Sequence, residues 1–295
     1  MSQPKICLIT PSYGPDFNRC KLLCETKEKF SSKYLKHYLI VDQPDVQLFK
    51  QLENDSTEVI SVNDILPKWL IKLPYTGKKN IWINLKGLPV RGWLVQQLVK
   101  LNIANYVKED TLIFGDSDTF FVKEFNLNNY NTNSTSRLFA QPNEVNQDHS
   151  LARWYHDAAT VLKIEVPKFP ATNYLGNLIY WRKENVFKLH KYIEDQHQKN
   201  WMQVICNNWN ISEYILYGVF VENILKENNN HTADSFDLCH NYWEEKALNE
   251  SNIKNFFSEI KTGQIAAMIS AKANIKTELY KSLINYHNIL YINKY

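Results

Sequence analysis

Two aspartates one residue apart follow a short apolar run near the middle of the chain. The run at 112–115 leads into Asp116, Ser117 and Asp118, and a second apolar run, 119–122, follows at once. A buried strand that ends in paired carboxylates is suited to hold Mg²⁺ or Mn²⁺, because these hard cations prefer carboxylate and phosphate oxygens. The alternative is an Asp-Ser-Asp turn between two strands, in which short polar side chains bond their own backbone.

Four other polar residues are of types that complete such a site. Lys86 and Arg91 flank a Gly-Leu-Pro turn and would neutralise phosphate, Arg91 through two parallel hydrogen bonds; otherwise they are solvated bases on a loop. His240 is a further candidate ligand for Mn²⁺, or else a histidine of an aromatic-rich turn. Glu213 begins a predicted helix, where a carboxylate either stabilises the helix end or acts as a base or clamp on a sugar hydroxyl.

Aromatic residues are frequent in the second half of the chain, and Tyr174 and Trp181 are candidates to stack on a sugar or a base. Side chains of this kind are more often part of a core. The sequence contains no GxGxxG, GxxxxGK[ST] or GxSxG pattern. A diphosphate would therefore be held by a metal ion and basic side chains rather than by a glycine-rich loop.

The elements that must position these residues alternate between strands and helices. Strands are predicted at 5–10, 37–42, 58–62, 112–115, 137–140 and 174–181, and helices at 16–30, 46–52, 91–106, 148–162, 184–197 and 214–225. This order predicts an α/β fold with a mostly parallel, doubly wound sheet. Ligands of such sheets bind at the carboxyl ends of the strands, where Thr10, Asp42 and Asp116 stand. We expect a catalytic domain over 1–250, an irregular segment at 68–85 within it, and a helical extension, 251–295, packed on it.

Composition excludes several classes of protein. The 295 residues are 44% hydrophobic, and their net charge of +3 is too small to indicate a nucleic-acid partner. Lys and Arg form no block, although a local basic patch that contacts anionic lipid is compatible with the sequence. No stretch approaches the roughly 18 apolar residues of a membrane-spanning helix. Five cysteines without a second close pair indicate reduced thiols in the cytoplasm, with the inner membrane face as an alternative place.

Seven segments together resemble a known group of enzymes. They are ITPSYGPDFNRCKLLCE, HYLIVD, KGLPVRGWLVQQLVKL, DSDTFFV, TNYLGNLIYWR, ISEYILYGVF and CHNYW, and they span most of residues 5–243. The chain resembles nucleotide-sugar glycosyltransferases of the GT-A fold, and in particular a group of uncharacterised bacterial proteins assigned as glycosyltransferases. More distantly it is similar to family 8 retaining galactosyltransferases and glycogenin.

The resemblance implies roles for individual residues. Asp116 and Asp118 would bind Mn²⁺ or Mg²⁺, with His240 completing the shell, and Glu213 and Asp118 would be the catalytic residues. The residues expected at the donor nucleotide are Thr10, Pro11, Tyr13, Asp42, Lys86, Arg91, Gln97, Asp116 and Ser117. Those expected at the sugar or acceptor are Asn173, Tyr174, Gly176, Asn177, Trp181 and Glu213. Because the helix start is Ser212-Glu213-Tyr214 rather than a pair of aspartates, the stereochemistry stays open. Glu213 would be the general base if the enzyme inverts, and it would position the sugar if the enzyme retains.

The sequence thus predicts a metal-dependent transferase that moves a sugar from a nucleoside diphosphate sugar, with UDP as the expected nucleotide. A glycan, a lipid-linked sugar or a protein would be the acceptor, and the oligomeric state is open. Two alternatives stand beside it: a metal-dependent nucleotidyltransferase, and a non-catalytic module that binds nucleotide sugars or glycans.

Overall fold

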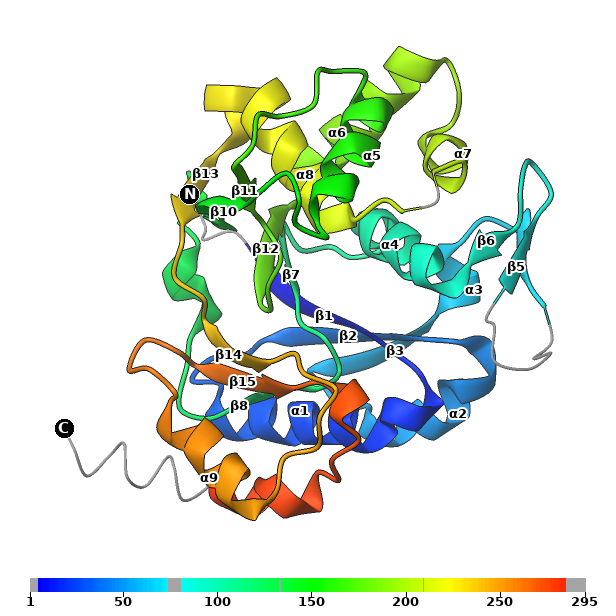
Figure 1. The fold of residues 1–295 in the computed structure, drawn as a ribbon. Coiled ribbons are helices and arrows are strands. Elements are labelled where there is room, and N and C mark those ends of the chain that lie inside the picture. The colour runs from blue at the N-terminus through cyan, green and yellow to red at the C-terminus, as the bar shows by residue number, and fades with distance from the viewer. Residues whose placement is uncertain (1–4, 74–80, 133, 209, 285–295) are drawn as a thin grey trace.

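A twisted five-stranded sheet forms the centre of the protein in its computed structural model, which describes residues 5–73, 81–132, 134–208 and 210–284 (Figure 1). Four strands run parallel, and the edge strand next to β7 is antiparallel. Across the sheet the order is β12 (Ile179–Arg182), β7 (Thr111–Phe114), β1 (Ile6–Ser12), β2 (Lys36–Val41) and β3 (Thr57–Ser61). The predicted α/β class with a mostly parallel sheet is therefore confirmed.

Helices cover both faces of this sheet. Two lie below it in Figure 1, namely α1 (Phe17–Phe30) and α2 (Val46–Phe49). A larger group lies above it and beside it, namely α3 (Val62–Ile65), α4 (Gly92–Asn102), α5 (Ala152–Leu162), α6 (Lys183–His197), α7 (Trp201–Cys206) and α8 (Glu213–Val219). Cys7 and Ile9 of β1 pack into the core under the upper group, whereas Ile6 and Leu8 pack into a second core on the opposite face. The buried central strand therefore serves both layers.

Four small sheets surround the central one. They are β4 (Leu70–Lys72), β5 (Ile81–Asn84) and β6 (Val90–Arg91); β9 (Ser136–Phe139) with β13 (His231–Asp234); β10 (Gln141–Val145) with β11 (Ala171–Asn173); and β8 (Thr119–Phe121), β15 (Ala266–Ile269) and β14 (Cys239–Tyr242). The β4–β6 sheet occupies the segment predicted to be irregular. The predicted strand at 174–181 forms only from Ile179, because Leu178 adopts a left-handed backbone with φ 58°.

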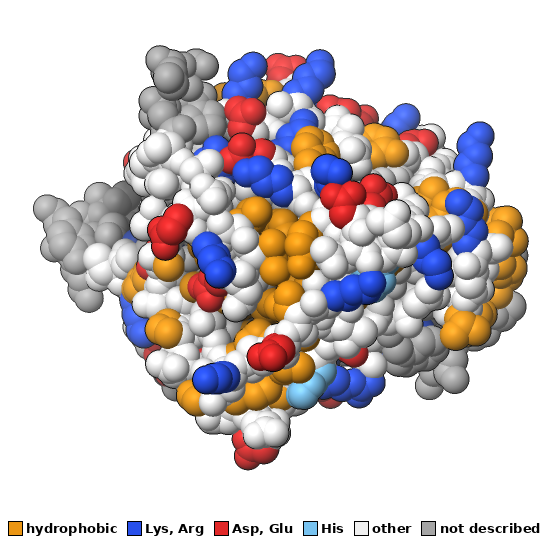
Figure 2. All heavy atoms as spheres, turned by 90° about the horizontal axis from the view of Figure 1, so that it is seen from above, with side chains coloured by type: hydrophobic (Ala, Val, Ile, Leu, Met, Phe, Trp, Pro, Cys, Tyr) orange, Lys and Arg blue, Asp and Glu red, His pale blue; other side chains and the backbone are white. Residues whose placement is uncertain are grey.

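The C-terminal segment contributes a strand as well as helices. Helix α9 (Glu250–Ser258) and residues 278–284 are helical, as expected, but β15 between them pairs with both β14 and β8. Residues 285–295 of the predicted extension lie outside the described residues. Within the described part of the chain, no helix has the length and apolar character needed to cross a bilayer. Charged side chains of both signs and apolar patches alternate over the upper surface (Figure 2).

Candidate functional site

The Asp116-Ser117-Asp118 turn leaves the carboxyl end of β7 and is held from behind by an amide. The backbone N–H of Asp116 and the hydroxyl of Thr119 both donate to Asn177 Oδ1, at 3.3 and 3.2 Å. Asn177, only 2% exposed, donates in turn to Asn241 Oδ1 at 2.9 Å. Asn177 was predicted to contact a sugar, and in the structure it fixes the backbone that carries the carboxylates.

Three carboxylates crowd together at this turn. Asp118 accepts a hydrogen bond from the backbone N–H of Ala271 at 2.8 Å. Burial, and then the charge of Asp116, raises the pKa of Asp118 to about 7. Asp16, which precedes α1, accepts from the Ser117 hydroxyl at 3.3 Å, and burial raises its pKa although Arg19 pairs with it at 3.2 Å. The turn is therefore a place where negative charge is incompletely neutralised by the protein.

A buried lysine joins this turn to the start of α8. Lys100 of α4 lies with its Nζ 2.9 Å from Glu213 Oε1, 2.9 Å from the Tyr214 hydroxyl and 3.6 Å from Asp116 Oδ1. Burial opposes its charge, but Glu213, Tyr214 and Asp116 together raise the pKa of Lys100 well above its usual range. Glu213 is itself only 2% exposed. One cation thus balances two carboxylates that come from separate elements.

These groups line a cavity of about 790 Å³. Its wall also contains three tryptophans, Trp93, Trp154 and Trp243, of which Trp93 and Trp154 stack with ring centroids 5.8 Å apart. Of the residues predicted from sequence, this cavity brings together Pro11, Tyr13, Gln97, Asn173, Gly176, Asp116, Ser117, Asp118 and Glu213. The cavity therefore unites most of the predicted donor, sugar and metal residues.

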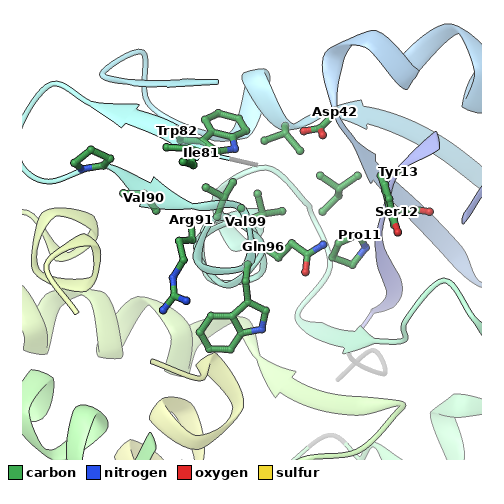
Figure 3. Close-up of a pocket in the computed structure, with 16 residues that line it drawn as sticks. Pro11, Ser12, Tyr13, Asp42, Ile81, Trp82, Val90, Arg91, Gln96 and Val99 are labelled. Carbon is green, nitrogen blue, oxygen red and sulfur yellow. The ribbon is translucent and has the colours of Figure 1, made fainter. Parts of the chain in front are cut away.

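A second cavity of about 780 Å³ adjoins the first and shares Pro11, Tyr13, Trp93 and Gln96 with it. Figure 3 shows Ile81 and Trp82 of β5 on one side and Ser12, Tyr13 and Asp42 on the other, with α4 between them. Most of its lining is apolar, and Asp42 and Arg91 supply charge of opposite sign. Asp42 also forms an ion pair with Lys72. The two cavities therefore lie side by side at the carboxyl ends of β1, β2 and β7.

Besides Asn177, five predicted residues lie outside the lining of both cavities, and each makes contacts within the protein. The Thr10 hydroxyl is buried against His37 Nε2 at 3.0 Å, and the Tyr174 hydroxyl donates to Glu222 at 2.5 Å. Trp181 is buried and stacks on Tyr217. Lys86 extends over the ring of Trp69, and His240 packs on Phe256 with its Nε2 3.9 Å from Glu259. The structure therefore does not bring these five residues to either cavity.

Sequence reasoning missed Asp16, Lys100 and the backbone of Ala271. Lys100 did carry a signal, because it is the sole charged residue in the apolar sequence of α4. Asp16 lies in the loop after β1, where a polar residue is unremarkable. The Ala271 contact spans 153 residues and depends on a backbone N–H, which has no signature in the sequence. Among the described residues, no group of three or more His, Cys, Asp and Glu side chains is placed to hold a metal ion.

Comparison with known proteins adds a family. No curated protein sequence matches the chain. One solved structure with a related arrangement is the apo form of mouse xyloside xylosyltransferase 1, at 7% identity and a TM-score of 0.46, covering 92% of this chain and 99% of that one. Residues 5–291 match the profile of a family described as a family of unknown function, DUF6492, and the chain belongs to that family.

Proposed function

We propose that this protein is a metal-dependent glycosyltransferase that uses a nucleoside diphosphate sugar. The observation that carries the proposal is that the two cavities adjoin and share part of their lining. One presents Asp116, Asp118 and Glu213 with Lys100, and the other, largely apolar, presents Asp42 and Arg91. A donor of this class has the same division, with a flat nucleoside at one end and a charged diphosphate and polar sugar at the other.

The nucleoside fits the second cavity. Ile81 and Pro89 offer apolar contact area there, and Asp42 at the end of β2 is an acceptor for ribose or base hydrogen-bond donors. Arg91 lies on the α4 side, where it supplies positive charge toward a phosphate. Placement across the carboxyl ends of parallel strands follows the general rule for open α/β sheets.

The residues at the turn fit a divalent cation. Asp116 and Asp118 would hold it through oxygen atoms, and the raised pKa of Asp118 marks negative charge that a cation would balance. Mg²⁺ commonly takes only one or two carboxylates and completes its shell with water and substrate phosphates. When bound, the cation supplies stabilisation of the charge that develops on the departing nucleoside diphosphate.

Side chains of the protein would position the sugar, take up the proton of the acceptor and bind the acceptor. Lys100 fixes the Glu213 carboxylate at the sugar end of the cavity. With this counter-ion, Glu213 is suited to accept a hydrogen bond from a sugar hydroxyl, or to take the proton of an attacking acceptor hydroxyl. The stacked Trp93 and Trp154, with the exposed Trp243, present apolar ring faces to an acceptor glycan.

Nucleotide binding and turnover test the proposal together. We expect UDP and UDP-sugars to bind by calorimetry in the presence of Mn²⁺ and to lose affinity in EDTA, and donor hydrolysis or transfer to release UDP. Asp118→Asn should abolish turnover, because it removes a charged cation ligand, without changing the thermal unfolding temperature. The matched control is Asp55→Asn, an exposed aspartate outside both cavities.

Three results would contradict the proposal. Undiminished turnover of Asp118→Asn in excess EDTA would remove the metal role. Release of pyrophosphate from a nucleoside triphosphate and a sugar phosphate would indicate a nucleotidyltransferase. Tight binding of nucleotide sugars with no turnover under any acceptor would indicate a binding module.

A further inference from the structure

The outer face of the β4–β5 hairpin is apolar where a surface strand is normally polar. In this antiparallel pair Ile71 lies opposite Ile83, and Leu73 N–H donates to Ile81 O at 3.3 Å. Leu70, Trp82 and Asn84 point inward and are buried, so the alternate positions face solvent. Ile71, Leu73, Ile83 and Leu85 are 44%, 37%, 37% and 66% exposed. A sheet with one wet face normally alternates apolar inward and polar outward residues.

Leu88 is a further exposed aliphatic residue in the same segment. It lies in the turn that joins β5 to β6 and is 69% exposed. The hairpin stands at the right-hand edge of the molecule in Figure 1, and hydrophobic and basic side chains share that edge in Figure 2. Contiguous exposed aliphatic residues on a surface of this kind mark a contact with another molecule or with a membrane.

The charged residues of the segment that carries this face are of one sign in the sequence. Between Asp64 and Glu109 the sequence contains no acidic residue and eight basic ones, at positions 68, 72, 78, 79, 86, 91, 100 and 108. Lys72 is paired with Asp42, and Lys100 is buried at the first cavity, so these two add no charge to the face. These basic residues are spread along the segment and form no continuous run, so the segment stands out by its lack of acidic residues. Lys68, Lys86 and Arg91 are exposed in the structure, close in sequence to the aliphatic residues.

We propose that this surface, the β4–β5 face, docks on an anionic lipid bilayer. The face consists of Ile71, Leu73, Ile83, Leu85 and Leu88, with Lys68 and Lys86 close to them in the sequence. Aliphatic side chains enter the boundary between headgroups and acyl chains, and basic side chains bind anionic headgroups. Both halves of this chemistry are present on one edge of the protein.

Charge separates the bilayer from a second copy of the chain as occupant. A symmetric dimer through the β4–β5 face would bring the two basic rims together, because a two-fold interface pairs each patch with itself. Like charges at an interface oppose association. An anionic surface meets the same rim with attraction, so charge complementarity favours lipid.

Docking would also orient the cavities. The second cavity is lined in part by residues of β5 and β6, namely Ile81, Trp82, Val90 and Arg91. Docking of the β4–β5 face would therefore bring this cavity close to the membrane. If the proposed glycosyltransferase activity holds, this position favours a lipid-linked acceptor over a soluble one. That consequence rests on the proposed function, whereas binding of the bilayer does not.

Vesicle sedimentation tests the docking. We expect the protein to sediment with vesicles of phosphatidylglycerol and phosphatidylcholine in equal parts, less with phosphatidylcholine alone, and less as salt rises. Ile71→Ser with Ile83→Ser should lower the apparent lipid affinity by about tenfold, because two aliphatic side chains no longer enter the bilayer. Lys68→Gln with Lys86→Gln should weaken binding to anionic vesicles alone.

The control is Leu279→Ser, an exposed leucine (61%) far from this face in the sequence. It should bind vesicles as the unaltered chain does, and all variants should keep its circular dichroism and unfolding temperature. The proposal would be overturned if the Ile71/Ile83 variant sedimented with vesicles as well as the unaltered chain does. It would also be overturned if the unaltered chain bound neither kind of vesicle. A dimer in light scattering that the same double substitution dissociates would overturn it too. Because vesicle binding needs no sugar donor, these outcomes are independent of whether the protein turns over a nucleotide sugar.

Discussion

At the level of single residues, Lys100 decides the electrostatics of the site. Its ammonium lies between Glu213 and Asp116, and it is nearly excluded from solvent. A buried ion pair contributes little net stability when complete, but removing one partner leaves the other as an uncompensated buried charge. Lys100 therefore matters for folding through what its absence would expose in Glu213.

Lys100→Met should destabilise the protein by about 3–5 kcal/mol, because Glu213 would be left buried without a counter-ion. Urea unfolding measures this change. Adding Glu213→Gln to Lys100→Met should recover part of the loss, since the uncompensated charge then disappears. A single variant as stable as the unaltered chain would show that water or another cation reaches Glu213.

Sequence reasoning found the acids of the site more readily than its bases. Asp116, Asp118 and Glu213 follow predicted strands or begin a predicted helix, and such positions are local features of the chain. Lys100 and Asp16 reach the same cavity only because α4 and the loop after β1 converge there. His240 was predicted to bind the metal because of its residue type and its position after the aspartate pair in the sequence. In the structure its ring packs on Phe256, a contact that depends on how the C-terminal segment folds back.

At the level of elements, the turn that carries Asp116 and Asp118 is held by hydrogen bonds with two segments that are distant in the sequence. Asn177, just before β12, binds its backbone, and Asn241 of β14 holds Asn177. Ala271, just after β15, donates to Asp118. The turn after β7 is thus held by residues in or beside β12, β14 and β15, which belong to two different sheets.

Asn177→Ala should destabilise the protein by about 1–3 kcal/mol, because the Asp116 N–H and the Thr119 hydroxyl lose a buried acceptor. The released turn should also weaken Mn²⁺-dependent UDP binding. Urea unfolding and calorimetry measure the two effects. Asn252→Ala, on the exposed side of α9, is the matched control and should change neither. Unaltered stability and UDP affinity in Asn177→Ala would show that the turn holds its shape unaided.

The central strands and larger helices were predictable because their apolar periodicity is strong. The departures have physical causes that lie outside a local window. Residues 70–72 form a strand of only three residues whose outward position is also apolar, so no alternation marks it. The alanine-rich segment Ala266–Ile269 favours helix by propensity, but pairing with β8 and β14 makes it a strand.

At the level of the whole molecule, buried histidines tie stability to pH. The ring of His190 in α6 stacks on Trp201 with centroids 3.9 Å apart, and burial lowers its pKa to about 3. Burial also lowers the pKa of His231 to about 4. In the unfolded chain both titrate near 6.5, so the unfolded state binds more protons at mildly acidic pH.

The unfolding free energy should therefore fall as pH drops below about 6.5, by up to about 1.4 kcal/mol per pH unit for each histidine. Above that pH the contribution of these groups is constant. His190→Phe keeps a flat ring on Trp201 and should reduce the slope between pH 7 and pH 5. Urea unfolding at both pH values measures it, and an identical slope in the variant would assign the acid sensitivity to other groups.

The hydrogen bond from Ala271 to Asp118 can form only late in the synthesis of these residues. Translation makes Asp118 153 residues before Ala271. A nascent chain on the ribosome can therefore assemble β1, β2, β3 and β7 and expose the aspartate pair while its last contact does not yet exist. The finished geometry of that pair arrives only after Ala271 has been made, so a chain that stops before that residue would lack the final form of a site whose carboxylates it already contains.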